Sequence, residues 1–141
     1  MSTILNLNIS YDKECLKNMT PSTFSFVGDA VYGLCVRSYL AKLPRPSKKL
    51  HGESVSYVSA SAQCKAFSII EPILSEEEIA IFKRGRNFHT NHTPKNSSSG
   101  EYHTATGLET LFGYLYLNGK SERLSYLFDI IWQMLTTANQ D

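Results

Sequence analysis

One acidic residue inside an apolar run constrains the fold of this chain more than any other feature. Residues 26–32 read Phe-Val-Gly-Asp-Ala-Val-Tyr, and a helix start, a Thr20 cap followed by Pro21, precedes them. Apolar residues recur from there at helical spacing, so the segment predicts one helix that ends near residues 43–44. An ionised carboxylate on an apolar helical face costs free energy unless something pairs it. Asp29 therefore either lies at the edge of the apolar stripe, facing water, or shares a partner with another group.

A second carboxylate, Glu109, occupies a similar place in an apolar stretch much later in the chain. A glycine stands four residues after each acid and another shortly before it: Gly33, Gly113, Gly28 and Gly107. Residues four apart share a helical face, so such glycines leave room beside the carboxylate for a partner helix, a metal ion or a bulky ligand. An interior glycine costs about 1 kcal/mol relative to alanine and needs a reason. Two interpretations stay open: close helix packing alone, or a helix pair that holds two carboxylates toward one divalent cation, which prefers oxygen ligands.

The rest of the chain also predicts helices. Apolar spacing and capping signals indicate a short helix at about 12–17 and longer ones at about 48–70, 76–87, 102–117 and 122–137. The third of these begins with a capping box, Ser75 to Glu78. We find no strand pattern, repeat or interdomain linker. The sequence therefore predicts a single-domain, all-α bundle of five or six helices.

Composition bounds the class of protein. The chain has 141 residues, of which 42% are hydrophobic and 19% charged, as in an ordinary soluble domain. No apolar run approaches membrane-spanning length, and the first ten residues lack the basic start of a secretory signal, so we expect no membrane. The three cysteines are odd in number and widely spaced, which favours a reduced, cytoplasmic setting.

Positive charge gathers in the middle of a chain whose net charge is +1. From Arg37 to Lys95 there are ten Lys and Arg but five acids. The run Lys83-Arg84-Gly85-Arg86-Asn87 precedes a polar, loop-like stretch, residues 88–100, that contains Lys95 and Asn96. These side chains suit contacts with a phosphate backbone, although cations at a solvated helix end are the ordinary alternative.

Other chemistries find little support. His89, His92, His103 and Cys64 fit no compact zinc-ligand spacing. The chain has neither a Gly-x-Ser-x-Gly elbow for a serine nucleophile nor a glycine-rich phosphate loop.

Four blocks along the chain form a recognisable pattern. They are Phe-Val-Gly-Asp-Ala-Val-Tyr (26–32), Lys-Arg-Gly-Arg-Asn (83–87), Thr-Pro-Lys-Asn (93–96) and Thr-Gly-Leu-Glu-Thr-Leu-Phe-Gly-Tyr-Leu-Tyr-Leu (106–117). In this order and spacing they resemble the Mini-III ribonucleases, small bacterial relatives of ribonuclease III. The resemblance implies one ribonuclease III-like catalytic domain over residues 1–141, with its core at about 21–137 and no separate RNA-binding domain. It further implies a homodimer that hydrolyses double-stranded RNA with Mg²⁺, or Mn²⁺ in its place, in the maturation of precursor (23S) ribosomal RNA.

The resemblance also assigns residues. Asp29 and Glu109 match the family's metal-binding, catalytic acids, and the RNA-binding side chains would be Lys83, Arg84, Arg86, Asn87, Lys95 and Asn96. Long-form ribonuclease III has further acids where this chain has Ser22, Ser25 and Thr106, which leaves two carboxylates per subunit. Two alternatives stay open: a noncatalytic RNA-binding or ribosome-associated protein that keeps the fold, and a helical interaction module without a nucleic-acid role.

Overall fold

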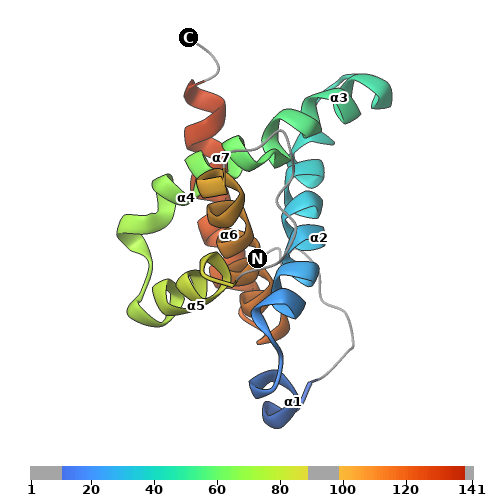
Figure 1. Cartoon of the computed structure of the whole chain (residues 1–141). Helices are drawn as coiled ribbons and strands as arrows, with labels where there is room; N and C mark the ends of the chain where they lie inside the picture. Colours follow the sequence, from blue (N-terminus) through green and yellow to red (C-terminus); the bar gives the residue numbers. More distant parts are fainter. Residues whose placement is uncertain (1–10, 89–98, 139–141) are drawn as a thin grey trace.

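The computed structural model describes residues 11–88 and 99–138, and every regular element in them is helical (Figure 1). The elements are α1 (Lys13–Lys17), α2 (Pro21–Leu40), α3 (Ser47–Val58), α4 (Ala60–Ile70), the 3-10 helix η1 (Glu71–Ile73), α5 (Glu76–Arg86), α6 (Ser99–Leu117) and α7 (Ser121–Ala138). The all-α class is confirmed. The prediction of five or six helices was too low, because these residues form seven α-helices.

Helix α2 begins where its local signals predict. The Thr20 hydroxyl accepts a hydrogen bond from the Thr23 amide at 3.2 Å, and Pro21 opens the first turn. The helix ends at Leu40, a few residues before the prolines that we expected to stop it.

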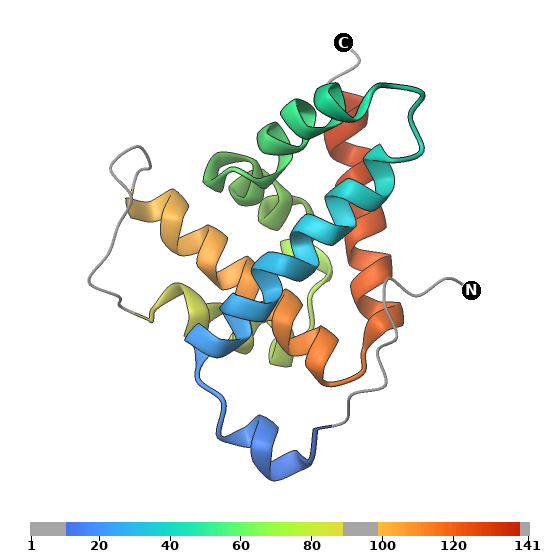
Figure 2. The same cartoon turned by 90° about the vertical axis from the view of Figure 1, so that its right-hand side faces the viewer.

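The helix predicted at 48–70 is in fact two helices, and this prediction was wrong. Ser59 has an extended backbone, with ψ of 159°, and its hydroxyl accepts a hydrogen bond from the Ala62 amide at 3.2 Å. Serine at such a position stabilises a new helix start, so the chain turns there. As a result α4 packs against α6, whereas α3 projects from the body with Ser54 as its one buried residue (Figures 1 and 2).

The two longest helices, α2 and α6, touch through glycine. A Cβ atom added at Gly28 would lie 1.6 Å from the Glu109 carbonyl oxygen, and one added at Gly113 would lie 1.9 Å from that of Phe24. Gly107 makes a similar close approach to the Phe82 ring. These three glycines therefore serve helix packing, and the same contact brings the acid-bearing segments of α2 and α6 together.

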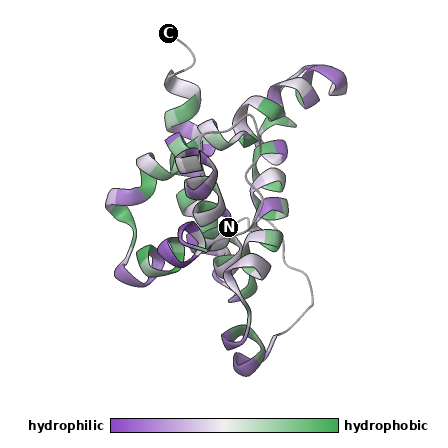
Figure 3. Ribbon diagram, in the orientation of Figure 1, coloured by the Kyte–Doolittle hydropathy of each residue, from purple (hydrophilic) through white to green (hydrophobic). Residues whose placement is uncertain are grey.

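The core lies around α6. Its fully enclosed side chains include Leu108, Leu111, Phe112 and Leu115. The Tyr32 ring meets Phe112 and Phe128 edge-on, with centroids 5.3 and 5.4 Å apart. In Figure 3 the outer end of α3 is hydrophilic, which fits its distance from this core. None of the described helices combines the length and apolar content that crossing a membrane requires.

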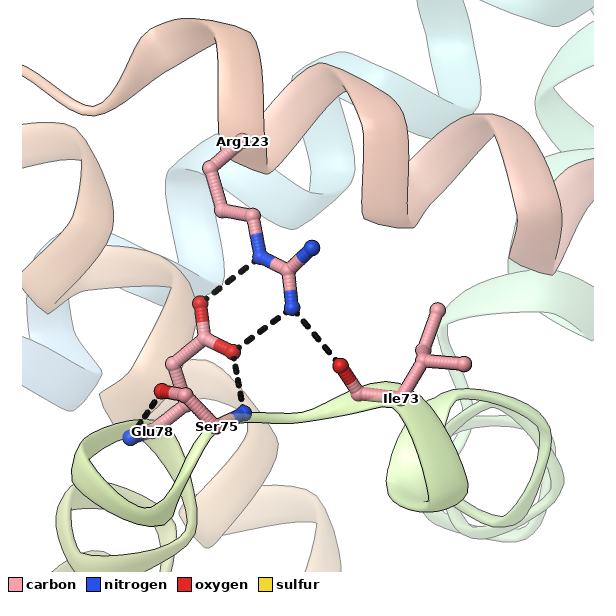
Figure 4. A network of polar contacts seen from close by, with 4 residues as sticks. All are labelled: Ile73, Ser75, Glu78 and Arg123. Carbon is pink, nitrogen blue, oxygen red and sulfur yellow. Dashed lines mark hydrogen bonds and ion pairs between the residues drawn. The ribbon is translucent and has the colours of Figure 1, made fainter.

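An ion pair fastens α5 to α7 (Figure 4). Arg123 donates from Nε to Glu78 Oε2 and from Nη2 to Glu78 Oε1, each at 2.8 Å, and Nη2 also reaches the Ile73 carbonyl at 2.8 Å. The Ser75 amide donates to Glu78 Oε1 at 2.8 Å while the Glu78 amide donates to Ser75 Oγ at 3.1 Å, so the predicted capping box is confirmed. Glu78 thus joins the start of α5 to the start of α7.

Candidate active site

Asp29 and Glu109 meet where α2 crosses α6. Asp29 is exposed and Glu109 is half-buried, and the two carboxyl groups lie close enough for Asp29 to raise the pKa of Glu109. The glycine contact explains why they meet, because the Glu109 carbonyl is the atom that lies against Gly28. The two acids predicted from the sequence as a pair are therefore neighbours in the fold.

The electrostatics of Glu109 are unusual. Burial, first, and the neighbouring charge of Asp29, second, raise the pKa of Glu109 from 4.5 to about 7, although hydrogen bonds from Gln63 and Ser25 act in the opposite direction. Near neutral pH the Glu109 carboxyl consequently retains its proton part of the time. A cation in place of that proton would relieve both the repulsion and the desolvation of the charged pair.

Two neutral donors hold the Glu109 carboxylate. Gln63 on α4, 3% exposed, donates from Nε2 to Glu109 Oε2 at 3.2 Å and to the Val58 carbonyl at 3.1 Å. Ser25 on α2 donates from Oγ to Glu109 Oε1 at 3.4 Å. Since both partners of the Gln63 amide are acceptors, its nitrogen must face them, which fixes the orientation of this side chain.

Sequence reasoning gave neither donor a role. Ser25 stood out as the position where longer relatives carry an acid, and that was the available signal for its place beside the site. Gln63 carried a weaker signal: it is a polar residue three and four positions before Ala66 and Phe67, on the buried face of α4. The buried face of α4 can be assigned only if a separate helix begins at residue 60. Because we did not predict the break at Ser59, we did not predict that Gln63 lies on that face.

The chemistry of these side chains fits a hard divalent cation. Asp29 and Glu109 offer carboxylate oxygens, the ligand type that Mg²⁺ and Mn²⁺ prefer. Within residues 11–88 and 99–138, no third His, Cys, Asp or Glu joins them to form a larger group of ligands. That these two carboxylates bind the ion stays a prediction.

The basic end of α5 lies close to the same part of α6. A Cβ atom added at Gly85 would lie 2.2 Å from the hydroxyl oxygen of Thr110, the residue after Glu109. Around this contact Lys83, Arg84 and Asn87 are exposed, while Arg86 is half-buried over the Phe82 ring, 5.7 Å from its centroid. In the part of the chain that the structure describes, Lys83 and Arg84 form no ion pair. The other two predicted RNA contacts, Lys95 and Asn96, lie outside the described residues.

Comparisons with known proteins give the family. Residues 22–120 match the Ribonuclease III domain. The Mini-ribonuclease 3 of Clostridium tetani is 37% identical over 137 residues, covering 96% of this chain and 91% of its own, and that of a Thermoanaerobacter species is 43% identical over 124 residues, covering 87% of each.

A solved structure supports the fold. The crystal structure of a Fusobacterium nucleatum protein superposes with a TM-score of 0.76 at 28% identity, covering 84% of this chain and 95% of that one. The resemblance inferred from four sequence blocks is therefore confirmed: the chain belongs to the Mini-ribonuclease 3 branch of the ribonuclease III family and is a ribonuclease.

Proposed function

We propose that this endoribonuclease hydrolyses double-stranded RNA with Mg²⁺, or Mn²⁺ in its place, bound by Asp29 and Glu109. One observation carries the proposal: two carboxylates from different helices lie near each other, and the pKa of Glu109 is raised to about 7. Such a pair is costly in a fold that has no use for it, and a divalent cation offsets that cost. When bound, the ion supplies positive charge to the scissile phosphate and a more acidic water ligand.

The chain's own residues then have distinct tasks. Asp29 is exposed and would face the RNA, whereas Glu109 is set deeper and held by donors on both carboxylate oxygens. Gln63 and Ser25 would keep Glu109 in one orientation whether or not a cation is present. This arrangement supports hydrolysis that depends on fixed positions of charge.

Recognition of the RNA would fall to the basic end of α5. Lys83, Arg84 and Arg86 offer positive charge, and Asn87 a neutral donor, within a turn that is anchored on α6 beside the acid pair. We include Lys95 and Asn96 in this surface on the strength of the sequence. Duplex RNA is bound mainly through its shape, phosphates and 2′-hydroxyls, so we expect modest sequence preference and strong salt dependence.

The proposal extends to a homodimer in the cytoplasm that matures precursor 23S ribosomal RNA. A two-fold dimer suits a substrate with two strands, because it sets one acid pair near each strand. We place Phe26, which lies three residues before Asp29 and is 81% exposed, in the interface of this dimer. The ribosomal substrate rests on the family alone.

The test compares cleavage and binding of a long RNA duplex in Mg²⁺. Asp29→Asn and Glu109→Gln remove charge but keep shape, so both variants should bind the duplex and fail to cut it. Glu122→Gln, at an exposed carboxylate in the first turn of α7, serves as the matched control and should cut like the wild type. A precursor 23S stem and an unrelated duplex, compared in the same assay, test the ribosomal substrate.

Two outcomes would contradict the proposal. If the wild type binds duplex RNA without cutting it in Mg²⁺ or Mn²⁺, the chain is a noncatalytic RNA-binding protein. If Arg84→Ala together with Arg86→Ala leaves duplex binding unchanged, the basic end of α5 is not the RNA surface.

A further inference from the structure

A hollow of about 450 Å³ lies away from the acid pair, between the C-terminal end of α2, α3 and α7. These three segments lie in the upper part of Figure 1. Its walls include Tyr39, Tyr57, Trp132, Arg45 and Glu53. Tyr39 follows Asp29 by ten residues on α2, which is about 15 Å along the helix axis. The hollow is thus a separate place on the molecule, and no step of the proposed hydrolysis uses it.

Three aromatic rings give the hollow flat, apolar walls. The Trp132 ring packs against Tyr57 with centroids 4.8 Å apart and against Tyr39 with centroids 5.3 Å apart. All three side chains are half-buried. Half-exposed rings of this kind suit a planar ligand that can stack on them.

The ion pair between Arg45 and Glu53, at the edge of the hollow, leaves one carboxylate oxygen without a hydrogen-bond donor among the described residues. The Arg45 guanidinium contacts Glu53 Oε1, but Glu53 Oε2 is shielded from water and has no hydrogen-bond partner within the described residues. A buried acceptor without a donor costs free energy and is uncommon without a reason. The side chain of Arg45 is 40% exposed, so it has room to turn and admit a donor to Oε2.

The charges around the hollow balance. Lys42 Nζ lies 5.0 Å from the centroid of the Tyr39 ring, and Arg45 adds a second positive charge. The two negative charges are those of Glu53, which lines the hollow, and Asp129, which accepts a hydrogen bond from the Tyr39 hydroxyl at 3.2 Å. With two cations against two carboxylates, the site favours an uncharged ring over a strongly charged one.

We propose that this hollow binds a guanine base. One edge of guanine carries the acceptor O6 beside two donors, N1–H and N2–H, so Arg45 would donate to O6 while Glu53 accepts from the two N–H groups. The ring of Trp132 would stack on the base. Adenine, cytosine and uracil lack two adjacent donor groups on one edge. The base comes from one of two sources, an unpaired guanosine in RNA or a free guanine nucleotide.

The first experiment uses the fluorescence of Trp132, the one tryptophan in the sequence. The full chain is titrated with GMP, and separately with AMP, CMP, UMP and inorganic phosphate. Saturable quenching by GMP, with weaker binding of the other three nucleotides, is expected if the free nucleotide is the ligand. Glu53→Gln should weaken GMP binding about tenfold, because it replaces a two-oxygen acceptor by an amide with one.

The second experiment addresses RNA. Binding is measured in EDTA, so that no cleavage occurs, for a duplex with one bulged guanosine and for the same duplex with a bulged uridine. If RNA supplies the base, the guanosine duplex binds more tightly, and Glu53→Gln abolishes the difference.

Two controls accompany these experiments: a matched variant, and a cleavage assay that shows whether Glu53→Gln folds. Glu122→Gln, on the same helix as Trp132 but ten residues earlier, should change neither experiment. Glu53→Gln should cut a fully paired duplex like the wild type, since Glu53 is remote from Asp29 and Glu109. A loss of hydrolysis in Asp29→Asn but not in Glu53→Gln would therefore support the acid pair as the catalytic site. It would not test the guanine site, which the two binding experiments test.

Either positive result supports the guanine site and identifies the source of the base. The inference is overturned if GMP does not quench Trp132 and the two bulged duplexes bind equally. It is also overturned if all four nucleotides bind alike and Glu53→Gln makes no difference, because stacking without recognition of the guanine edge would produce that result.

Discussion

Replacement of Gly28 by alanine tests the contact on which the acid pair depends. The new Cβ would lie 1.6 Å from the Glu109 carbonyl oxygen, whereas an ordinary contact needs at least 3.4 Å, so the α2 and α6 backbones would have to separate by roughly 2 Å. Overpacking of this severity costs about 3 kcal/mol or more, and the better helix propensity of alanine returns about 1 kcal/mol. We therefore expect the free energy of unfolding to fall by about 2 kcal/mol or more.

Urea denaturation, followed by circular dichroism, measures this change. Gly52→Ala is the matched control, because Gly52 lies inside α3 and a Cβ added there would meet nothing within 4 Å. The same substitution at that site should stabilise the chain by about 0.5–1 kcal/mol through helix propensity alone. Cleavage of duplex RNA should also drop in Gly28→Ala and stay unchanged in Gly52→Ala, since the clash displaces the backbone that carries Glu109.

One result would refute the reasoning. If Gly28→Ala is as stable as Gly52→Ala, the two helices do not approach as closely as the contact requires. The glycines would then have a role unrelated to packing, and the juxtaposition of Asp29 with Glu109 would lose its structural cause.

Three further predictions concern the charged groups. Arg123→Met should lower the stability by about 2 kcal/mol at pH 7 in urea denaturation, because it leaves Glu78 without its partner. Arg123 lowers the pKa of Glu78 in the folded chain, so this contribution is present above the ordinary pKa of 4.5 and the variant should approach the wild type as the pH falls below it. Folding raises the pKa of Glu109, so the stability of the wild type should fall as the pH rises from about 4.5 to about 7. Glu109→Gln removes this charge. Without metal, the variant should therefore unfold at a higher urea concentration than the wild type at pH 8 but not at pH 4. In Asp29→Asn, NMR titration without metal should show the pKa of Glu109 below about 7 yet above 4.5, because burial, the larger cause, remains.

The capping residues in the sequence correctly predicted where α2 and α5 begin. Thr20 before Pro21, and Ser75 with Glu78, specify their caps within four residues, and the predicted hydrogen bonds form. The association of Asp29 with Glu109 was also within reach, since each acid lies among glycines on an apolar helix and glycines of this kind let two helices approach closely.

The break at Ser59 depends on contacts between distant parts of the chain. No proline or glycine marks it, and the serines and alanines on either side are compatible with one continuous helix. The gain comes from burying Ala66, Phe67 and Ile70 once α4 turns toward the core. Such a choice between a cap and a continuous helix is made by tertiary packing, which a single sequence does not reveal.

The packing of α6 explains how the fold tolerates the acid pair. A pKa shift of Glu109 from 4.5 to about 7 corresponds to about 3 kcal/mol of destabilisation when the group is charged. Its neighbours Leu108 and Leu111 are fully buried, and each stabilises the fold by about 2 kcal/mol. Because these residues flank Glu109 on the same helix, the hydrophobic contacts that bury α6 against α2 also hold the carboxylate beside Asp29. The charge repulsion is therefore retained in the folded chain, and a cation bound as we propose would relieve it.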